Sequence, residues 1–483
     1  MKNLKGIAAM AVLAAVAAAG VDVNAEVRPA SMIGDNMILP QNTDAKLWGT
    51  ADPGEKVTVI PSWSGKKYET TADRTGEWSL AVATPEGSFA PMSLQIYGET
   101  GPARNIHNLL IGEVWLASGQ SNMEMPLKGF DGCIVKDGFK EIAGSNAYAD
   151  RVRFFTVPNK QSYTPQDDVD AHWTVPSPET SPEYSAVAWH FAKQTSDVLQ
   201  VPVGIVRAAY GGSRVESWLP ADILKNYKDV DLDPKAIEAY NPSWERPLLM
   251  YNAMFNPVCN YSYNGIIWYQ GCSNVNQADT YADRLETMVR HWRNQIGRGD
   301  IPFYAVEIAP YEYGSGKSPY LRLAQWDAVK ALPNADMICI NDLVQPNEKY
   351  NIHPGDKESV GRRLSDLALN KTYGKKQFME GSPRYTGHRV DGDKMIVGIE
   401  SKNKGICSNY DIRGFEIAGD DGEFYEVNPA DVTFLWQTNE FQLTNPNVKN
   451  PKYVRYGFRD FMPGTVFGGN HLPLIPFSSK LDK

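Results

Sequence analysis

Ser121 lies where a hydrolytic nucleophile is expected, in the pentapeptide Gly119-Gln120-Ser121-Asn122-Met123. The run before it, residues 111–118, is largely apolar and has the length of a buried strand. A serine in the tight turn after such a strand has its hydroxyl lifted out of the core, and its backbone N–H can face an oxyanion. The alternative interpretation is an ordinary polar turn at the end of a strand.

Three further candidates follow other apolar runs: the pair Gly211 and Gly212, then Asn274, then His353. Taken singly, each has a simpler explanation as a tight turn, a helix N-cap or a solvated loop residue. Together with a serine, these groups suit acyl transfer, because they attack an ester carbonyl, move the proton and stabilise the oxyanion. The predicted roles are nucleophile for Ser121, general base for His353, and oxyanion hole for Gly211, Gly212 and Asn274.

These candidates require a scaffold that brings four strand ends together. Between residues 107 and 373, strand-like apolar runs alternate with helical patterns. The runs are 114–116, 152–157, 203–206, 265–269, 303–306 and 337–340, and the helical patterns are 184–200, 281–296 and 356–369. This alternation favours an α/β fold, a parallel sheet with helices on both faces. Ligands of such sheets bind at the carboxyl ends of the strands, where all the candidates lie.

Short strand-like runs with Gly and Pro turns flank this region on both sides. They predict small sandwich-like β regions at the N- and C-terminal ends. Asp391-Gly392-Asp393, between two such runs, is a hairpin signal. The predicted organisation is a signal peptide over 1–25, an N-terminal β domain over 26–106, a catalytic domain over 107–373 and a C-terminal β region over 374–483.

The first 25 residues have the basic start, the Ala-rich apolar stretch and the small residues of a secretory signal peptide. We therefore expect an exported protein, periplasmic or secreted. No other stretch approaches 18 uninterrupted apolar residues, so no membrane span is expected. The net charge of −9, without a Lys/Arg block, argues against a nucleic-acid partner. The five cysteines lack zinc-ligand spacing, and we predict no metal and no cofactor; one or two disulfides stay open.

The segment from Ile111 to Leu127 resembles the nucleophile segment of the sialate O-acetylesterase family, a group of SGNH-type carbohydrate esterases. Other blocks similar to the family's are 211–218, 268–274, 352–364 and the Arg322-x-x-Gln325 pair. The resemblance covers nearly the whole chain after the leader. It implies an SGNH-hydrolase-like fold and an exported serine esterase that removes O-acetyl groups from carbohydrates, with 9-O-acetylated sialic acid as the first candidate substrate.

The resemblance also suggests residues that bind substrate: Gln120, Gln270, Arg214 and Arg322. In a sialate complex the two arginines would meet the sugar carboxylate. Relatives of this type also act on acetylated plant polysaccharides, so a xylan-type acetyl esterase is one alternative. A carbohydrate-binding relative of low activity is another. A glycosidase would need two paired carboxylates, and no motif nominates them.

Two departures from the family pattern affect the predicted site. The family usually has Glu where this chain has Cys272, and a neutral thiol cannot replace a carboxylate. Related hydrolases often place an acid shortly before the histidine, where this chain has Tyr350 and Asn351. The remaining candidates for an acid are Asp342, Glu348 and Asp356. The sequence thus predicts a Ser–His dyad whose imidazolium lacks an assigned acid, which would reduce activity.

Overall fold

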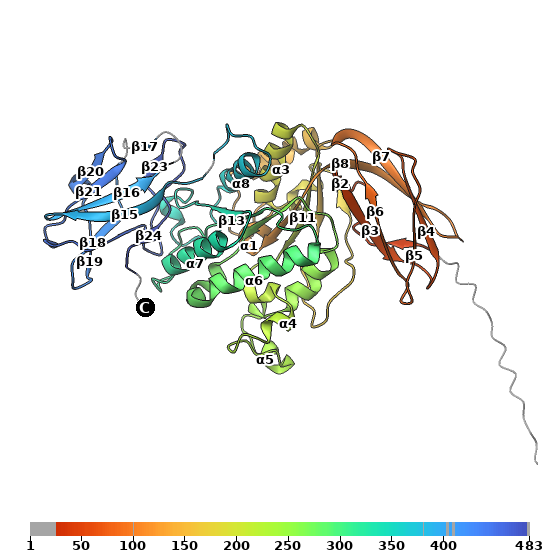
Figure 1. Cartoon of the computed structure of the whole chain (residues 1–483), viewed down its shortest axis with the longest axis horizontal. Helices are drawn as coiled ribbons and strands as arrows, with labels where there is room; N and C mark the ends of the chain where they lie inside the picture. The colour runs from red at the N-terminus through yellow and green to blue at the C-terminus, as the bar shows by residue number, and fades with distance from the viewer. Residues whose placement is uncertain (1–25, 100, 380, 402–404, 408–410, 481–483) are drawn as a thin grey trace, which may run out of the picture.

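The computed structural model describes residues 26–99, 101–379, 381–401, 405–407 and 411–480. The predicted signal peptide lies outside the described residues. In Figure 1 the N-terminal strands lie at one end, the C-terminal strands at the other, and the helical part between them. Among the described residues, no helix has the length and apolar character needed to cross a bilayer.

The N-terminal part consists mainly of antiparallel strands. They are β1 (Arg28–Pro29), β2 (Ile38–Pro40), β3 (Asp44–Thr50), β4 (Lys56–Pro61), β5 (Tyr68–Thr71), β6 (Glu77–Ala83), β7 (Ser88–Tyr97) and the long β8 (Arg104–Gly119). β1, β3 and β6 form a sheet of their own, whereas β4, β5 and β7 join β8, and β2 pairs in parallel with β8. Apolar side chains of both groups share one core, as predicted for a sandwich-like region.

The central part is built on a parallel sheet that includes β8. Its further strands are β9 (Val152–Thr156), β10 (Trp173–Thr174), β11 (Val203–Ala209), β12 (Gly265–Tyr269), β13 (Phe303–Val306) and β14 (Ala335–Ile338). The order is β10-β9-β11-β8-β12-β13-β14, and only β10 on this path runs antiparallel to its neighbour. The strands that carry Ser121, the glycine pair and Asn274 are therefore adjacent, with β8 in the centre.

Helices cover both faces of this sheet. They are α1 (Ser121–Glu124), α2 (Gly138–Gly144), α3 (Ala186–Leu199), α4 (Ala221–Leu224), α5 (Pro234–Glu238), α6 (Ala278–Ile296), α7 (Ser318–Ala331) and α8 (Lys357–Lys371). Alternate residues of β8 face opposite layers. Trp115 and Ala117 pack in the cluster with α3 and α8, whereas Val114 and Leu116 pack in the cluster with α6 and α7. The predicted α/β fold with helices on both faces is confirmed.

Local signals explain where the helices begin and end. The Ser185 hydroxyl accepts the Ala188 N–H at the start of α3, and the Asp356 carboxylate accepts the Ser359 N–H at the start of α8. Gly297 ends α6 in the left-handed conformation. The helix α7 was not predicted, because the polar residues Arg322 and Gln325 lie on its buried face and interrupt the apolar pattern.

The C-terminal part is antiparallel. Its strands are β15 (Arg384–Asp391), β16 (Lys394–Glu400), β17 (Ile406–Cys407), β18 (Phe415–Ala418), β19 (Phe424–Glu426), β20 (Val432–Leu435), β21 (Glu440–Leu443), β22 (Tyr453–Tyr456), β23 (Phe467–Gly468) and β24 (Phe477–Ser478). β15 and β16 form the hairpin predicted around Gly392. The sheets β15-β16-β21-β20 and β19-β18-β22-β24 share an apolar core, so this part is sandwich-like as expected.

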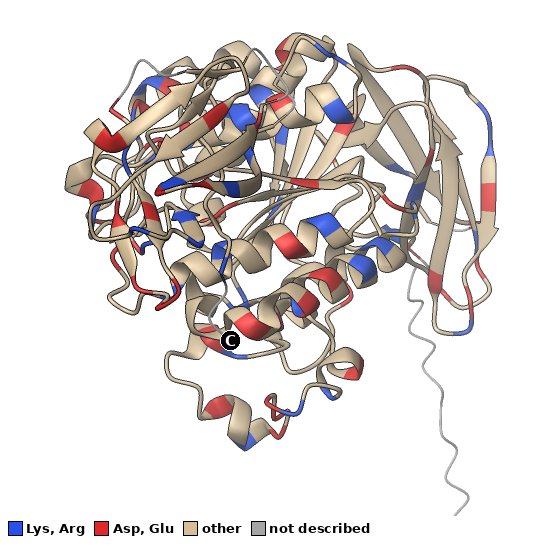
Figure 2. Ribbon diagram, turned by 60° about the vertical axis from the view of Figure 1, so that its left-hand side comes forward, with Lys and Arg blue, Asp and Glu red and all other residues tan. Residues whose placement is uncertain are grey.

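The boundary predicted between residues 106 and 107 falls inside β8, which continues from the N-terminal strands into the parallel sheet. The division into domains at the predicted positions remains a prediction. Figure 2 shows Lys and Arg intermixed with Asp and Glu over the ribbon.

Candidate active site

Ser121 begins α1 directly beyond the end of the central strand. In the sheet register, Gly119 at the end of β8 lies between Ala209 of β11 and Tyr269 of β12. Gly119 has φ +135°, and a Cβ there would lie 2.2 Å from the Tyr269 carbonyl oxygen. Only glycine fits this position, and it lets the chain turn so that Ser121 stands above three adjacent strand ends.

His353 reaches Ser121 from a loop at the edge of the sheet. Its Nε2 lies 2.8 Å from the Ser121 Oγ. The loop is tied to the residue after the serine: the Asn122 Nδ2 donates to the Ile352 carbonyl at 2.9 Å. The Lys357 ammonium donates to the Asn122 Oδ1 at 2.6 Å. Asn122 thus holds the serine turn and the histidine loop in a fixed relation.

The other nitrogen of His353 faces a thiol. The Cys133 Sγ lies 3.7 Å from Nδ1 and 3.6 Å from the Asn351 Oδ1. That same oxygen accepts the His353 backbone N–H at 3.0 Å. The Phe130 ring packs edge-on against the imidazole, with ring centroids 5.4 Å apart.

The three acids left open by the sequence are engaged elsewhere. Asp342 forms a two-point ion pair with Arg363, at 2.6 and 2.7 Å. Glu348 accepts the backbone N–H of Gly355, and Asp356 caps α8. Within the described residues, no carboxylate hydrogen-bonds the Nδ1 of His353.

This environment disfavours the charged form of the histidine. Burial, with a smaller contribution from the charge of Lys357, lowers the pKa of His353 from 6.5 to about 4. Burial likewise lowers the pKa of Lys357 to about 7. Burial raises the pKa of the Cys272 thiol, which is therefore neutral at neutral pH. At neutral pH the imidazole is unprotonated and free to accept a proton.

The Asn274 side chain, which follows the adjacent strand β12, is held in one orientation. Its Oδ1 accepts the Val215 N–H at 3.0 Å and the Gln270 amide at 2.7 Å. Its Nδ2 donates to the Glu216 carboxylate at 3.0 Å. The second N–H of the amide has no acceptor among the described residues, and the whole side chain is buried.

Glu216 is itself part of a buried ionic network. It pairs with Arg284, and the exposed fractions of the two side chains are 6% and 2%. Arg284 also pairs with Asp229, whose side chain is 59% exposed. The guanidinium therefore balances the charge of the carboxylate beneath Asn274.

The two glycines of the predicted oxyanion hole differ. The N–H of Gly211 donates to the Glu124 carboxylate at 2.5 Å, so it is occupied. Glu124 is also bound by Asn159 at 2.7 Å. Gly212 has φ +74°, and its N–H has no acceptor in the part of the chain that the structure describes.

The four residues predicted to bind substrate are already bonded within the protein. Gln120, Gln270 and Arg322 are buried: Gln120 accepts the Gly271 N–H, Gln270 holds Asn274, and Arg322 donates to main-chain carbonyls. Such buried, satisfied groups position the loops, which argues against direct substrate contact for these three. The Arg214 guanidinium is ion-paired with Glu245, a partner that its sequence position did not suggest.

Sequence reasoning assigned no role to Cys133, Glu124 or Trp244. Cys133 and Trp244 lie in irregular loops without periodicity. Glu124 follows Ser121 by one helical turn, and this spacing could have suggested that the two lie together. All five cysteines are free thiols in the structure, so none of the disulfides left open forms.

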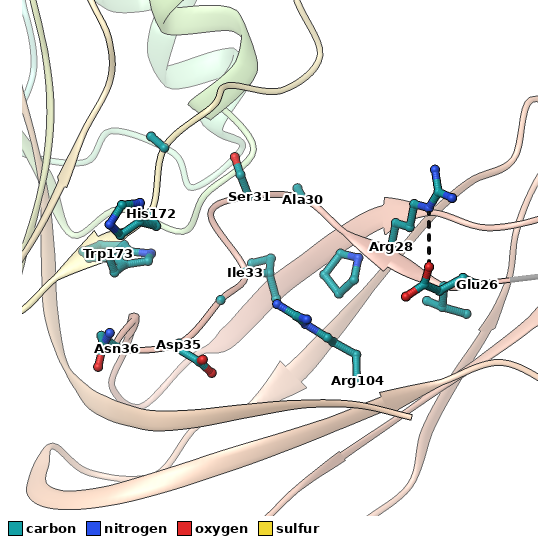
Figure 3. Close-up of a pocket in the computed structure, with 14 residues that line it drawn as sticks. Glu26, Arg28, Ala30, Ser31, Ile33, Asp35, Asn36, Arg104, His172 and Trp173 are labelled. Carbon is teal, nitrogen blue, oxygen red and sulfur yellow. Dashed lines mark ion pairs between the residues drawn. The ribbon is translucent and has the colours of Figure 1, made fainter. Parts of the chain in front are cut away.

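A cavity of about 610 Å³ lies elsewhere, against the N-terminal strands (Figure 3). Arg28, Asp35, Arg104 and His172 line it. None of the residues around it belongs to the cluster at Ser121, so this cavity is separate from the candidate site.

The parallel sheet, with a serine–imidazole pair and an oriented amide at its strand ends, is an arrangement suited to ester hydrolysis. The model of the family described as carbohydrate esterase, sialic acid-specific acetylesterase, matches residues 111–370. The chain belongs to this family and is a carboxylic ester hydrolase.

Individual proteins similar to this chain point to the same family. Sialate O-acetylesterase of Homo sapiens is 28% identical over 391 residues, 74% of this chain and 73% of that protein. The enzyme of Mus musculus is 28% identical over 469 residues, 85% and 86% of the two chains. A carbohydrate acetylesterase structure from Xanthomonas citri is 28% identical with a TM-score of 0.84, covering 94% of this chain and all of that one. The predicted family is confirmed.

Proposed function

We propose that the protein is an exported serine esterase that hydrolyses O-acetyl esters of carbohydrates at Ser121. The observation that carries this proposal is the 2.8 Å contact between the Ser121 Oγ and the His353 Nε2 at the carboxyl ends of three parallel strands. The choice of an acetylated carbohydrate as substrate is based on the family and on the relatives named above.

In the first half of the reaction, the Ser121 Oγ bonds to the acetyl carbon while His353 takes the hydroxyl proton. The carbonyl oxygen becomes an oxyanion, which the Asn274 amide and the N–H groups of Gly212 and Ser121 stabilise. Collapse breaks the bond to the sugar oxygen, which receives the proton from His353. Water then attacks acetyl-Ser121 in the same way and releases acetate.

We propose that Cys133 and Asn351 position His353 in place of an acid. Cys133 lies at Nδ1, and Asn351 fixes both the thiol and the histidine backbone. A neutral partner orients the ring but stabilises the imidazolium less than a carboxylate does. The rate therefore depends more on stabilisation of the oxyanion than it does in an enzyme whose histidine is paired with an acid.

The first candidate substrate is 9-O-acetylated sialic acid, in keeping with the family. A neutral acetylated sugar, such as those of xylan-type polysaccharides, is the second. The ion pair between Arg214 and Glu245 favours this second candidate, because it neutralises the cation that would meet the sialate carboxylate.

The test compares wild type with Ser121→Ala on three acetyl esters: 9-O-acetylated sialic acid, acetylated xylan and p-nitrophenyl acetate. Released acetate should fall at least about 1000-fold in the variant. Ser118→Ala is the matched control, since this buried serine of β8 donates to the Ala208 carbonyl and takes no part in the reaction. Equal release by wild type and Ser121→Ala would contradict the proposal.

Export is inferred from the leader sequence of residues 1–25. Cleavage after Ala25 would leave Glu26 as the first residue. N-terminal sequencing of the protein recovered outside the cytoplasm should begin at Glu26. Recovery of the full-length chain in the cytoplasmic fraction alone would refute export.

A further inference from the structure

We infer that Trp244 forms a carbohydrate-binding platform beside Ser121, on which the pyranose ring that carries the acetyl group stacks. This inference rests on the proposed function of Ser121. Trp244 lies in the short turn Ser243–Glu245, after α5, in the segment between β11 and β12.

The glycine pair places the indole next to the reacting serine. A Cβ on Gly211 would lie 3.6 Å from the Ser121 Cβ. A Cβ on Gly212 would lie 2.1 Å from the Trp244 Cδ1 and 2.4 Å from its Nε1. The indole therefore packs directly against the Gly212 backbone, with Ser121 next to the neighbouring glycine. Any side chain at Gly212 would displace the indole.

Trp244 packs on Gly212 but leaves much of its aromatic surface exposed to solvent. It is 47% exposed, although most of the chain's tryptophans are buried. Its Nε1–H has no acceptor among the described residues, so it can donate to a sugar hydroxyl. An aromatic face with one polar edge suits a pyranose ring, which has an apolar face and hydroxyls around its rim.

The turn that carries Trp244 is anchored on both sides. Glu245 pairs with Arg214, which follows the glycine pair by two residues. The Gln161 amide donates to the Ser243 carbonyl at 3.2 Å and to the Tyr210 hydroxyl at 3.3 Å. The ion pair with Arg214 ties the turn to the loop that follows Gly212. The indole is therefore held in place before substrate binds. A platform fixed in advance loses little entropy on binding.

This arrangement gives the Arg214–Glu245 pair a role other than recognition of a carboxylate. The pair holds the platform, and the platform recognises the shape of the sugar ring. The proposed subsite therefore accepts acetylated pyranoses through stacking.

The experiment measures kcat and KM of Trp244→Ala on 9-O-acetylated sialic acid and acetylated xylo-oligosaccharide, with ethyl acetate as an ester without a ring. For the sugar that wild type deacetylates, KM should rise about tenfold while kcat changes less than about threefold. Hydrolysis of ethyl acetate should stay within about twofold. Trp244→Phe should recover part of the loss, and Trp436→Ala, at a side chain 73% exposed in the C-terminal part, is the matched control.

Binding is measured separately by calorimetry with the same two sugars and the inactive Ser121→Ala protein, with and without Trp244→Ala. The dissociation constant should rise about tenfold when the indole is removed. An unchanged sugar KM, a parallel loss on ethyl acetate, or no sugar binding by Ser121→Ala would each overturn the platform. Failure of the esterase proposal has a different signature, namely full activity of Ser121→Ala with the platform intact.

Discussion

The two groups proposed to act with Ser121 are held by opposite kinds of chemistry. On one side the Asn274 amide rests on Glu216, which is buried and paired with Arg284. On the other side the His353 ring rests on the Cys133 thiol, with no carboxylate in contact with its Nδ1 among the described residues. Fixed charges thus orient the proposed donor to the oxyanion, whereas the proposed proton acceptor has uncharged support.

The difference teaches where the transition state is stabilised. An amide held by an ion pair does not reorganise when the oxyanion forms, and this is what makes such donors effective. An imidazole without an acid stays neutral to low pH but gains less when it takes a proton. We therefore expect the Asn274 side to contribute more to the rate than the support of His353 does.

The largest effect should come from Asn274→Ala. Removal of the amide takes away a donor to the oxyanion and should lower kcat about 100- to 1000-fold, with KM changed less than about threefold. Steady-state kinetics on p-nitrophenyl acetate measure this. Asn370→Ala, which removes a buried amide bonded to the Phe378 carbonyl, is the control for general loss of stability. A kcat loss of less than tenfold would mean that Asn274 does not face the oxyanion.

Glu216→Gln should have the next largest effect, because it leaves Arg284 buried with only Asp229 as a charged partner. We expect the free energy of unfolding to fall by about 3 kcal/mol and kcat to fall about tenfold. Asp229→Asn, at the exposed end of the same network, should cost less than about 1 kcal/mol. Urea unfolding of both variants measures this, and equal losses would show that burial of the pair is unimportant.

The uncharged surroundings of His353 lead to a prediction for the pH dependence of kcat/KM. The proposed reaction needs neutral His353, so we expect activity to be lost as the pH falls through the pKa of His353 in the folded protein, about 4. The kcat/KM of wild type should stay nearly constant from pH 8 down to about 5 and reach half its value near pH 4. A pH–rate profile with a half-point near 6.5 would instead indicate a solvated histidine.

Cys133→Asp sharpens the comparison by supplying a charge at Nδ1. The carboxylate should raise the pKa of His353, so the acid limb of kcat/KM moves upward by about one pH unit or more. Cys133→Ala, which removes the partner without adding charge, should lower kcat about threefold to tenfold and leave the limb in place. If the limb does not move in Cys133→Asp, the thiol does not lie against the imidazole in solution.

The smallest effect should come from Cys272→Glu. Burial raises the pKa of Cys272, the charge of nearby Lys357 opposes this, and no hydrogen bond joins Cys272 to His353 among the described residues. A glutamate there should raise the pKa of Lys357 from about 7 but change kcat at neutral pH less than about threefold. A large gain in kcat would show that the missing acid limits the rate from this position.

The sequence was sufficient to predict the scaffold. The parallel strands, the long helices α3, α6 and α8, and the C-terminal hairpin follow from short-range periodicity and turn residues. The rule that ligands bind at carboxyl ends of parallel strands predicted that Ser121 and His353 lie together, and their side chains are 2.8 Å apart.

The contacts that tune the site were not predictable. Cys133 meets His353 across 220 positions of sequence, and Trp244 meets Gly212 through an irregular segment. Both lie in segments whose path is set by tertiary contacts, such as the bond from the Gln161 amide to the Ser243 carbonyl beside Trp244. Two glutamines and two arginines were expected to bind substrate. Three of them, Gln120, Gln270 and Arg322, are buried and support the loops instead.

The 16-residue strand β8 has a consequence for how the chain assembles. Its first half pairs with β7, and its second half is flanked by β11 and β12, which are synthesised later. As the chain emerges, the N-terminal strands can hold β8 while its far end waits as an open edge. We expect this edge to serve as the template on which the later parallel strands add, so that the N-terminal part acts as an internal folding aid for the esterase.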